Sequence, residues 1–448
     1  MPKKTTFWLT MMLSMLLSLL VACGPGPSTG TAPSSHMSAT ELPPGENLYV
    51  LDGYTSPGTT STAQQIIAFH PGSPSPNKLL TLPAGLTSMD HRSLYIAASQ
   101  GGQTTISVIN TQSGATIRSL VIPGNYSTAG QSFANAVLSF DGQWLALREL
   151  GQAGNVTTIA LVDTQAGKLV KTIHLDGNFD LDAVNPDGAA LYLLQRLNDA
   201  SGHYYVELYN VKENELYQNP LIDKTELNDP RMTGTALARQ MASNGTEAYT
   251  LYIDTDHNIA FVHILPLDPG FPFARCVNLP VGKSADLLRY YTLTLSADGS
   301  TLYAANGALG VAGKIDLTPA GNNDIWDDNL VATTHFNPGV VSMTSSDTTR
   351  VLYNGAVLSP DQRRLYFVGL QGIWAVNTSD LHAQLGTSVP HFLTQQTFTG
   401  IAISQDGRTL YAVDPKHGIT VLDARTGQAQ GVIQGPAHSP WGIAWITN

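Results

Sequence analysis

The stretch ISQDGRTLYAVDPKHGITVLDARTG, residues 403–427, contains three short apolar runs separated by two turn signals. Asp406 and Gly407 predict a tight reversal, because glycine adopts positive φ without steric cost and aspartate bonds its own backbone. The flanking runs, residues 401–404 and 409–413, are rich in β-branched and aromatic residues and are too short for independent helices. With the runs at 419–423 and 430–434, they predict a sheet of four antiparallel strands.

This pattern recurs along most of the chain. Tight-turn signals of the same kind stand at residues 141–142, 187–188, 244–245 and 298–299. The strand after the first turn carries Leu-Tyr or a close relative in eight units, at Tyr49, Tyr95, Leu145, Tyr192, Tyr249, Tyr303, Tyr366 and Tyr411. The spacing of roughly 45 to 63 residues is typical of four-stranded propeller blades with variable loops. The sequence therefore predicts an all-β protein, a β-propeller.

The repeated units resemble the YVTN-type β-propeller repeat, whose core is close to SPDGRRLYVA followed by VSVIDTATG. The resemblance covers residues 47–448 and is carried by SQDGRTLYAV together with the VINTQSG, LVDTQAG and VLDARTG segments. It implies the propeller fold, which lactonase-like and quinoprotein-like proteins share. It implies no catalytic residue, because function lies in sites built on a fold and not in the fold itself.

The two ends of the repeat region predict how the ring closes. The first unit, from residue 47, lacks a first strand, and residues 441–446 form a lone first strand without partners. Pairing residues 441–446 with residues 47–51 would remove both exposed edges. We therefore expect eight blades, one of them built from both termini. Seven is the alternative, if residues 235–280 are an elaborated insertion.

The first 46 residues predict export and anchoring. An apolar run at residues 7–20 follows Lys3 and Lys4 and is too short for a spanning helix, but it fits a secretory signal at residues 1–22. The sequence LVAC, residues 20–23, resembles a bacterial lipobox, which implies that Cys23 becomes the lipidated N-terminus. Residues 23–46, rich in Pro, Gly, Ser and Thr, are expected to be a flexible tether. The expected location is outside the cytoplasmic membrane, with the propeller at residues 47–448.

Composition limits the partners. The chain has 448 residues, 13% of them charged, and a formal net charge of −11, which argues against nucleic acid. Its membrane contact is expected through Cys23 alone. The second cysteine, Cys276, is expected to be a small buried apolar residue. We expect a monomer without cofactor or metal, which binds a protein or a small molecule.

Three motif matches are better explained as ordinary loops. Residues 26–30 match the nucleophile-elbow pattern but lie in the predicted tether. Residues 254–258, DTDHN, begin like a calcium loop, yet Ile259 stands where glycine is required. Residues 324–329, DIWDDN, are expected to form an acidic exposed loop.

The longest connections predict a binding face. Residues 223–234, 281–290 and 335–353 are consecutive in blade order and should lie on the face opposite the Asp-Gly turns. Arginine beside tyrosine is favoured at binding surfaces. The expected face comprises Asp229, Arg231, Asp286, Arg289, Tyr290, Arg350 and Tyr353. Arg289 and Arg350 are expected to contact an acidic or carbonyl-bearing group, unless these arginines simply pair with neighbouring carboxylates.

Three functions remain open at this point. The first is a binding or scaffolding propeller without catalytic activity. The second is a lactonase-like or quinoprotein-like enzyme with a site at the channel mouth. The third is a structural component of the cell envelope.

Overall fold

The computed structural model describes residues 45–53, 64–72, 75–129, 134–152, 155–199, 202–223, 229–270, 273–318, 330–337, 352–381, 391–392 and 396–447. The chain divides between residues 38 and 39, and every described residue belongs to the second unit, residues 39–448. The predicted signal, the lipidation residue Cys23 and nearly all of the tether therefore lie outside the described residues. None of the described helices is both long and apolar enough to cross a membrane.

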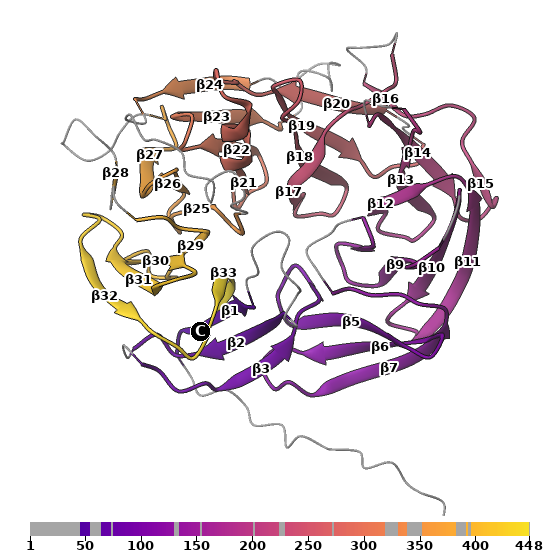
Figure 1. The fold of residues 1–448 in the computed structure, drawn as a ribbon, viewed down its shortest axis with the longest axis horizontal. Helices are drawn as coiled ribbons and strands as arrows, with labels where there is room; N and C mark the ends of the chain where they lie inside the picture. Colours follow the sequence, from indigo (N-terminus) through magenta and orange to yellow (C-terminus); the bar gives the residue numbers. More distant parts are fainter. Residues whose placement is uncertain are drawn as a thin grey trace, which may run out of the picture. The chain divides into compact units, whose positions relative to one another are not determined.

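The second unit is an eight-bladed β-propeller, as the repeats predict (Figure 1). From the channel outward, blade 1 consists of β33 (Pro440–Thr447), β1 (Asn47–Asp52), β2 (Gln65–Phe69) and β3 (Leu80–Pro83). Blade 2 consists of β4 (Leu86–Thr87), β5 (Ser93–Gln100), β6 (Gln103–Asn110) and β7 (Thr116–Pro123). Blade 3 consists of β8 (Ala136–Leu138), β9 (Trp144–Arg148), β10 (Val156–Asp163) and β11 (Lys168–Asp176). Blade 4 consists of β12 (Phe179–Val184), β13 (Ala190–Arg196), β14 (Tyr204–Asn210) and β15 (Glu215–Leu216).

Blade 5 has five strands, β17 (Thr235–Met241), β18 (Glu247–Asp254), β19 (Ile259–Pro266), β20 (Phe273–Asn278) and β16 (Ile222–Asp223), which adds to the outer edge in parallel. Blade 6 consists of β21 (Tyr291–Leu295), β22 (Thr301–Asn306), β23 (Val311–Asp316) and β24 (Leu330–His335), and the 3-10 helix η1 (Ala285–Tyr290) precedes it. Blade 7 consists of β25 (Ala356–Leu358), β26 (Arg364–Val368), β27 (Ile373–Asn377) and β28 (His391–Phe392). Blade 8 consists of β29 (Gly400–Ile403), β30 (Thr409–Asp414), β31 (Gly418–Asp423) and β32 (Ala429–Ile433). Because residues 235–278 supply a complete blade, the seven-blade alternative is wrong.

The C-terminal strand closes the ring. β33 pairs antiparallel with β1, from Asn47 opposite Thr447 to Asp52 opposite Pro440. The expected pairing of the two loose edges is thus confirmed, and blade 1 draws its strands from both ends of the repeat region.

The first turn of the blades is fixed by a short network of hydrogen bonds. In blade 3, Ser139 Oγ donates to Asp141 Oδ1 at 2.6 Å, and Gln143 N donates to the same oxygen at 3.0 Å. Gly142 adopts φ +73°, and a Cβ placed there would overlap the hydroxyl of Tyr95 in blade 2. The same Ser-Asp contact of 2.6 Å recurs at Asp90, Asp298, Asp361 and Asp406. The glycine of the repeated turn therefore allows the backbone to reverse and leaves the space that a side chain of the preceding blade, here Tyr95, occupies.

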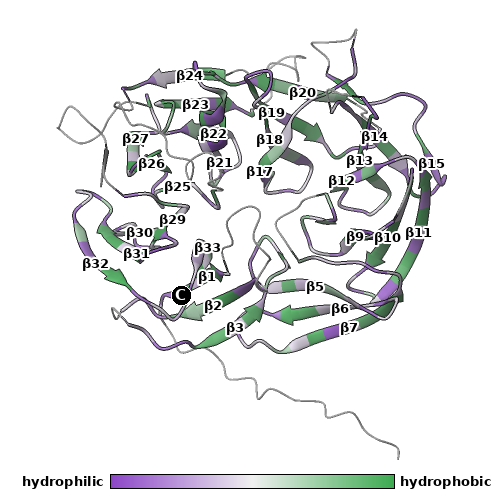
Figure 2. Ribbon diagram, viewed as in Figure 1, coloured by the Kyte–Doolittle hydropathy of each residue, from purple (hydrophilic) through white to green (hydrophobic). Residues whose placement is uncertain are grey.

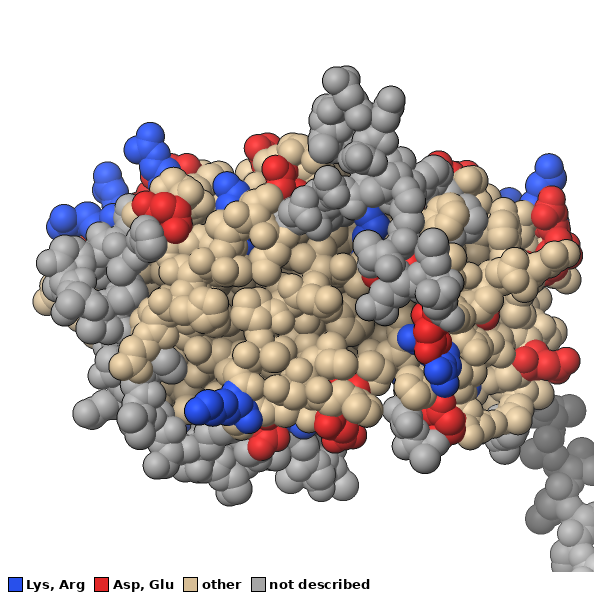
Figure 3. Space-filling model, turned by 90° about the horizontal axis from the view of Figure 1, so that it is seen from above, with Lys and Arg blue, Asp and Glu red and all other residues tan. Residues whose placement is uncertain are grey.

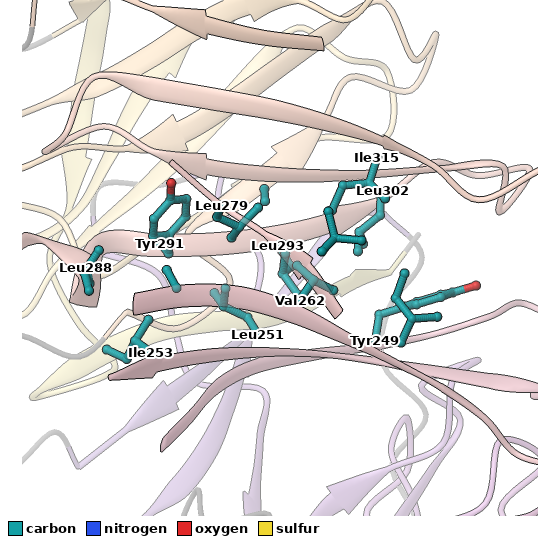
Figure 4. Packing of buried hydrophobic residues seen from close by; sticks show 14 of the residues in the cluster. Tyr249, Leu251, Ile253, Val262, Leu279, Leu288, Tyr291, Leu293, Leu302 and Ile315 are labelled. Carbon is teal, nitrogen blue, oxygen red and sulfur yellow. The ribbon is translucent and has the colours of Figure 1, made fainter. Parts of the chain in front are cut away.

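The hydrophobic core lies between the blades. Each pair of neighbouring blades shares a cluster of buried residues, including the pairs 8–1 and 1–2 that the terminal strand completes. Between blades 5 and 6, Tyr249, Leu251 and Val262 pack against Leu293 and Leu302 (Figure 4). Hydrophobic residues follow the strands and hydrophilic residues gather in many of the connections (Figure 2). Burial between sheets, at roughly 25 cal/mol per Å² of apolar surface, is therefore what holds the ring together.

Candidate functional site

The two faces of the ring carry different connections. The first turn and the turn between the third and fourth strands share one face, because Thr164 Oγ1 donates to Gly142 O and Thr111 Oγ1 donates to His91 O. We call this the turn face. The opposite face, which carries the loops between second and third strands and the connections between blades, is the loop face. In the side view, most charged side chains lie toward the two rims and the band between them is largely uncharged (Figure 3).

A cluster of three charged residues lies on the loop face between blades 3 and 4. Arg148 stands at the end of β9, Asp180 near the start of β12 and Arg196 at the end of β13. Arg196 Nε donates to Asp180 Oδ2 at 2.7 Å, and Arg148 Nη1 lies 3.7 Å from Asp180 Oδ1. The side chains are 27% (Arg148), 13% (Asp180) and 31% (Arg196) exposed. We call these three residues the arginine cluster.

Two asparagines hold the cluster in place. Arg148 donates from Nη2 to Asn178 Oδ1 at 3.1 Å and from Nη1 to Asn135 Oδ1 at 3.3 Å. Backbone hydrogen bonds add to these contacts: Arg148 N donates to Asn135 O, and Arg196 N donates to Asn178 O. Each arginine is therefore fixed at both its backbone and its head group. Such preorganised donors lose little entropy when they bind a ligand.

Asp182, two residues after Asp180 on β12, forms a buried ion pair with Arg239. Arg239, on the innermost strand of blade 5, donates from its guanidinium to the carboxylate and the backbone oxygen of Asp182. The register of β12 shifts between Leu181 and Ala183, so that Asp182 stands at an irregularity in the ladder. The Asp182 side chain is 2% exposed, and a buried pair of this kind is costly to form unless it is fully hydrogen-bonded.

The arginine cluster continues into a row of polar contacts across blades 4 and 5. The Arg196 guanidinium lies 4.8 Å from the ring centroid of Tyr204, whose hydroxyl donates to Thr233 O at 3.3 Å. Thr233 Oγ1 donates to Asp254 Oδ2, and the same oxygen lies 2.7 Å from His257 Nδ1. We call the arginine cluster together with Tyr204, Thr233, Asp254 and His257 the polar strip.

Hydrogen bonds tune the carboxylate and the imidazole at the end of the strip. Burial opposes ionisation of Asp254, but hydrogen bonds from Thr233 and His257 hold its pKa below the usual range. The hydrogen bond to Asp254 raises the pKa of His257. Residues 254–258 therefore form a turn in which the Asp254 carboxylate accepts hydrogen bonds from protein donors.

Two further ion pairs flank the polar strip. Arg231 Nη2 lies 2.6 Å from Asp229 Oδ2, and both side chains are exposed. The hydrogen bond from Arg231 lowers the pKa of Asp229 to about 2. His203 Nδ1 lies 2.7 Å from Asp199 Oδ2, and His203 is close enough to Asp229 to lower the pKa of that carboxyl further. Met232 pairs with Tyr204 through backbone hydrogen bonds, which places the predicted residues Asp229 and Arg231 beside the strip.

The remaining residues of the predicted binding face lie in another sector. Asp286, Arg289 and Tyr290 lie on η1, before blade 6, where Asp286 is exposed and Tyr290 is buried. Tyr290 and Leu287 of this helix pack with Leu352, the residue before Tyr353. Thus the structure brings η1 and the segment before blade 7 together, but it attaches Asp229 and Arg231 to the polar strip instead.

Tyr353 faces inward. Its ring lies 5.9 Å from that of Trp441 on β33, and a Cβ on Gly442 would overlap its side chain. Burial raises the pKa of Tyr353 to about 12. Arg350 lies outside the described residues, as does the acidic stretch at residues 324–329.

Sequence reasoning missed the arginine cluster. One signal was present in FDLDAV, residues 179–184, where two aspartates interrupt an otherwise apolar innermost strand. The arginines themselves carry no local signal, because each ends an ordinary blade strand. Cys276 is half-buried on β20 against the cluster between blades 4 and 5. Within the described ranges, no group of three or more His, Cys, Asp or Glu side chains is arranged to hold a metal ion.

Comparison with known proteins finds no matching family model and no matching curated protein. Among solved structures, a putative 6-phosphogluconolactonase from Bacteroides fragilis is 14% identical, covers 81% of this chain and 100% of its own, and has a TM-score of 0.40. The periplasmic gluconolactonase of Pseudomonas aeruginosa is 13% identical, covering 88% and 98%, with a TM-score of 0.41. A dihydro-heme d1 dehydrogenase is 14% identical, covering 90% and 75%, with a TM-score of 0.46. These likenesses concern the fold and carry no information about activity, and the YVTN-type repeat stays a resemblance.

Proposed function

We propose that this protein is a binding module, anchored outside the cytoplasmic membrane through lipidated Cys23, whose loop face over blades 3 to 5 binds a protein or small-molecule partner. The observation that supports this proposal is the polar strip. Its side chains join three blades at one face through consecutive contacts, from Arg148 to His257.

Physical chemistry favours a ligand at this strip. Partly buried ions cost desolvation energy, and neighbouring blades elsewhere in the ring meet mainly through apolar side chains. Arginine and tyrosine side chains held in one geometry supply directed donors and rigid area, which are the usual anchors of binding surfaces. The apolar clusters between the blades stabilise the ring without these ions. We therefore infer that the charged residues are kept because they contact a ligand.

The sector around η1 extends the proposed surface. Arg289 is half-buried, and no ion-pair partner for it occurs among the residues that the structure describes. Arg289 therefore stays part of the proposal as a contact for an acidic or carbonyl-bearing group. Arg350, the second arginine of that prediction, lies outside the described residues.

One observation favours an enzymatic alternative. Asp254 binds Nδ1 of His257 and leaves Nε2 directed away from the pair, and the His257 side chain is 53% exposed. A carboxylate that orients an imidazole in this way is a common arrangement for a general base. The alternative predicts that ligand is consumed when it is incubated with wild-type protein and persists with a His257→Gln variant.

Binding is tested with full-length protein on arrays of oligosaccharides and peptides. The loop-face variant carries Arg148→Ala, Arg196→Ala and Arg231→Ala. The matched control carries Arg363→Ala, Arg408→Ala and Arg425→Ala, three exposed arginines of the turn face. We expect ligands that wild type and control bind and that the loop-face variant loses. Ligands retained by the loop-face variant and lost by the control would contradict the proposal.

The anchor is tested separately. A Cys23→Ser variant is expected to leave the membrane fraction or to keep its signal peptide. Wild-type protein that is soluble and cleaved at another residue would contradict lipidation at Cys23.

A further inference from the structure

We propose that the ligand of the loop face presents a carboxylate group, which the guanidinium fork of Arg196 holds with two parallel hydrogen bonds. This inference rests on the binding role proposed above and names the chemistry of that site.

Arg196 has N–H donors that no described residue of the protein uses. Of its five N–H groups, the one on Nε is used by Asp180 at 2.7 Å. Its two terminal nitrogens make no hydrogen bond to any residue in the described part of the chain. The side chain nevertheless remains partly exposed at the loop face, so that a ligand arriving from solvent meets the free edge of the fork.

The fork is held rigidly. Tyr204, which lies beneath the guanidinium at 4.8 Å, is fully buried and is fixed by backbone bonds to Met232. A guanidinium over an aromatic face is attracted to the ring, and on its other side Asp180 fixes the Nε edge. The contacts with Tyr204 and Asp180 therefore restrict the Arg196 side chain before a ligand arrives, so that binding costs less conformational entropy than at a freely exposed arginine.

The charge of the site favours an anion. In the arginine cluster, two guanidinium groups face one carboxylate, which leaves one positive charge in excess. The adjacent Arg239 is neutralised by Asp182 and is buried, so that it adds no free charge. Asp229 and Asp199 nearby are paired with Arg231 and His203, so that the excess is confined to the arginine cluster and acts on a group in contact with the fork.

The shape and charge of the fork favour a carboxylate over a phosphate. A planar carboxylate matches the planar fork with two bonds and carries one negative charge, equal to the local excess. A phosphate monoester carries nearly two negative charges and a third oxygen, for which the described residues of the cluster offer no further cation. We therefore assign the site to a carboxylate, from a uronic acid or from an acidic side chain.

The experiment uses isothermal titration calorimetry on full-length protein with matched pairs of small probes. One pair is galacturonate and its methyl ester, and the other is N-acetylglutamate amide and N-acetylglutamine amide. Galactose 6-phosphate is the tetrahedral anion. We expect one of the acids to bind at least about tenfold more tightly than its neutral partner and than the phosphate, in line with a charge-assisted bidentate contact. The acid that binds identifies the source of the carboxylate.

Variants test the role of the fork. Arg196→Lys keeps the charge but not the fork, and Arg196→Gln removes both, so that both should weaken the acid about tenfold or more. Arg408→Gln on the turn face is the control and should leave affinity unchanged. Because the acid and neutral probes are compared on wild-type protein, the proposal remains testable even if an Arg196 variant is unstable. Equal binding of acid and neutral probes, or full affinity in Arg196→Lys, would overturn the carboxylate assignment, whereas an array ligand lost by the loop-face variant would still support binding there.

Discussion

The indole ring of Trp445 stacks on the phenol ring of Tyr49, with centroids 4.5 Å apart and an interplanar angle of 23°. The two residues lie opposite each other in the β1–β33 ladder, although nearly four hundred residues separate them in the chain. His91 of blade 2 stacks on Trp445 as well, at 5.3 Å. The last strand therefore binds both the blade it completes and the next blade of the ring.

Replacing Trp445 by alanine tests the closure. Trp445 is buried, and truncation of a buried aromatic residue costs about 3 to 5 kcal/mol in free energy of unfolding. We expect a loss of this size in urea unfolding, with Val432→Ala, at an exposed position on β32, as the control. Deletion of residues 440–448 should cost still more. Equal midpoints for wild type and the deletion would mean that the C-terminal strand does not close the ring.

The repeated turn predicts a difference between two glycines. Gly142 and Gly151 have nearly the same φ, +73° and +74°, but a Cβ at Gly142 would overlap Tyr95, whereas nothing lies within 4 Å of a Cβ at Gly151. Both alanine variants lose about 1 kcal/mol through the backbone, and Gly142→Ala loses about 1 to 3 kcal/mol more through the overlap. Thermal unfolding of the two variants measures this difference. Adding Tyr95→Phe, which removes the overlapping hydroxyl, should recover part of the extra loss for Gly142→Ala alone.

Because Glu207 is buried, we expect the free energy of unfolding to fall as pH rises from about 4.5 to 7. Its side chain lies on β14, the residue is 6% exposed, and burial raises its pKa to about 7 from a value of 4.5. Between these two values the folded state keeps a proton that the unfolded state has lost, so that the free energy of unfolding decreases with increasing pH. The decrease amounts to at most about 3 kcal/mol between pH 4.5 and pH 7. A Glu207→Gln variant should lack this slope in urea unfolding, and a slope unchanged by the substitution would assign it to other groups.

Because His263 is buried, we expect it to make the free energy of unfolding rise with pH, opposite to Glu207. It is fully buried, and neither of its ring nitrogens has a hydrogen-bond partner among the described residues. Burial lowers its pKa and Arg239 lowers it further, against the opposing influence of Asp182 and Asp223. As pH falls below about 6.5, the unfolded state gains a proton before the folded state does, so that stability is lost.

A His263→Leu variant separates this effect from that of Glu207. We expect it to resist acid better than wild type, as measured by the urea midpoint at pH 5 relative to pH 8. An acid sensitivity identical to that of wild type would show that His263 is not the group responsible.

The sequence predicted the ring more completely than the site. Turn signals such as Asp406-Gly407 act over a few residues and each unit repeats them, so that the blades could be recognised from local chemistry. Closure by the C-terminal strand followed from the unpaired strands at the two ends of the repeat region, and seven blades stayed open until the structure showed eight. The arginine cluster does not follow in this way, because Arg148, Asp180 and Arg196 come from three strands of two blades. Their meeting depends on the stagger between neighbouring sheets. Asp229 and Arg231, which the structure places beside the polar strip, were selected because a long connection is itself a signal, whereas the end of a regular strand is not.

The most direct test of the binding face is a hydrogen exchange footprint of full-length protein with the tightest array ligand. We expect slower exchange in residues 134–148, 178–204 and 229–257, which supply the polar strip, and unchanged exchange in the turns at residues 359–363 and 404–408. In the loop-face variant, the same ligand should not slow exchange in any of these segments. Protection confined to the turns, or protection of equal size in the loop-face variant, would contradict the assignment of the binding site to the loop face over blades 3 to 5.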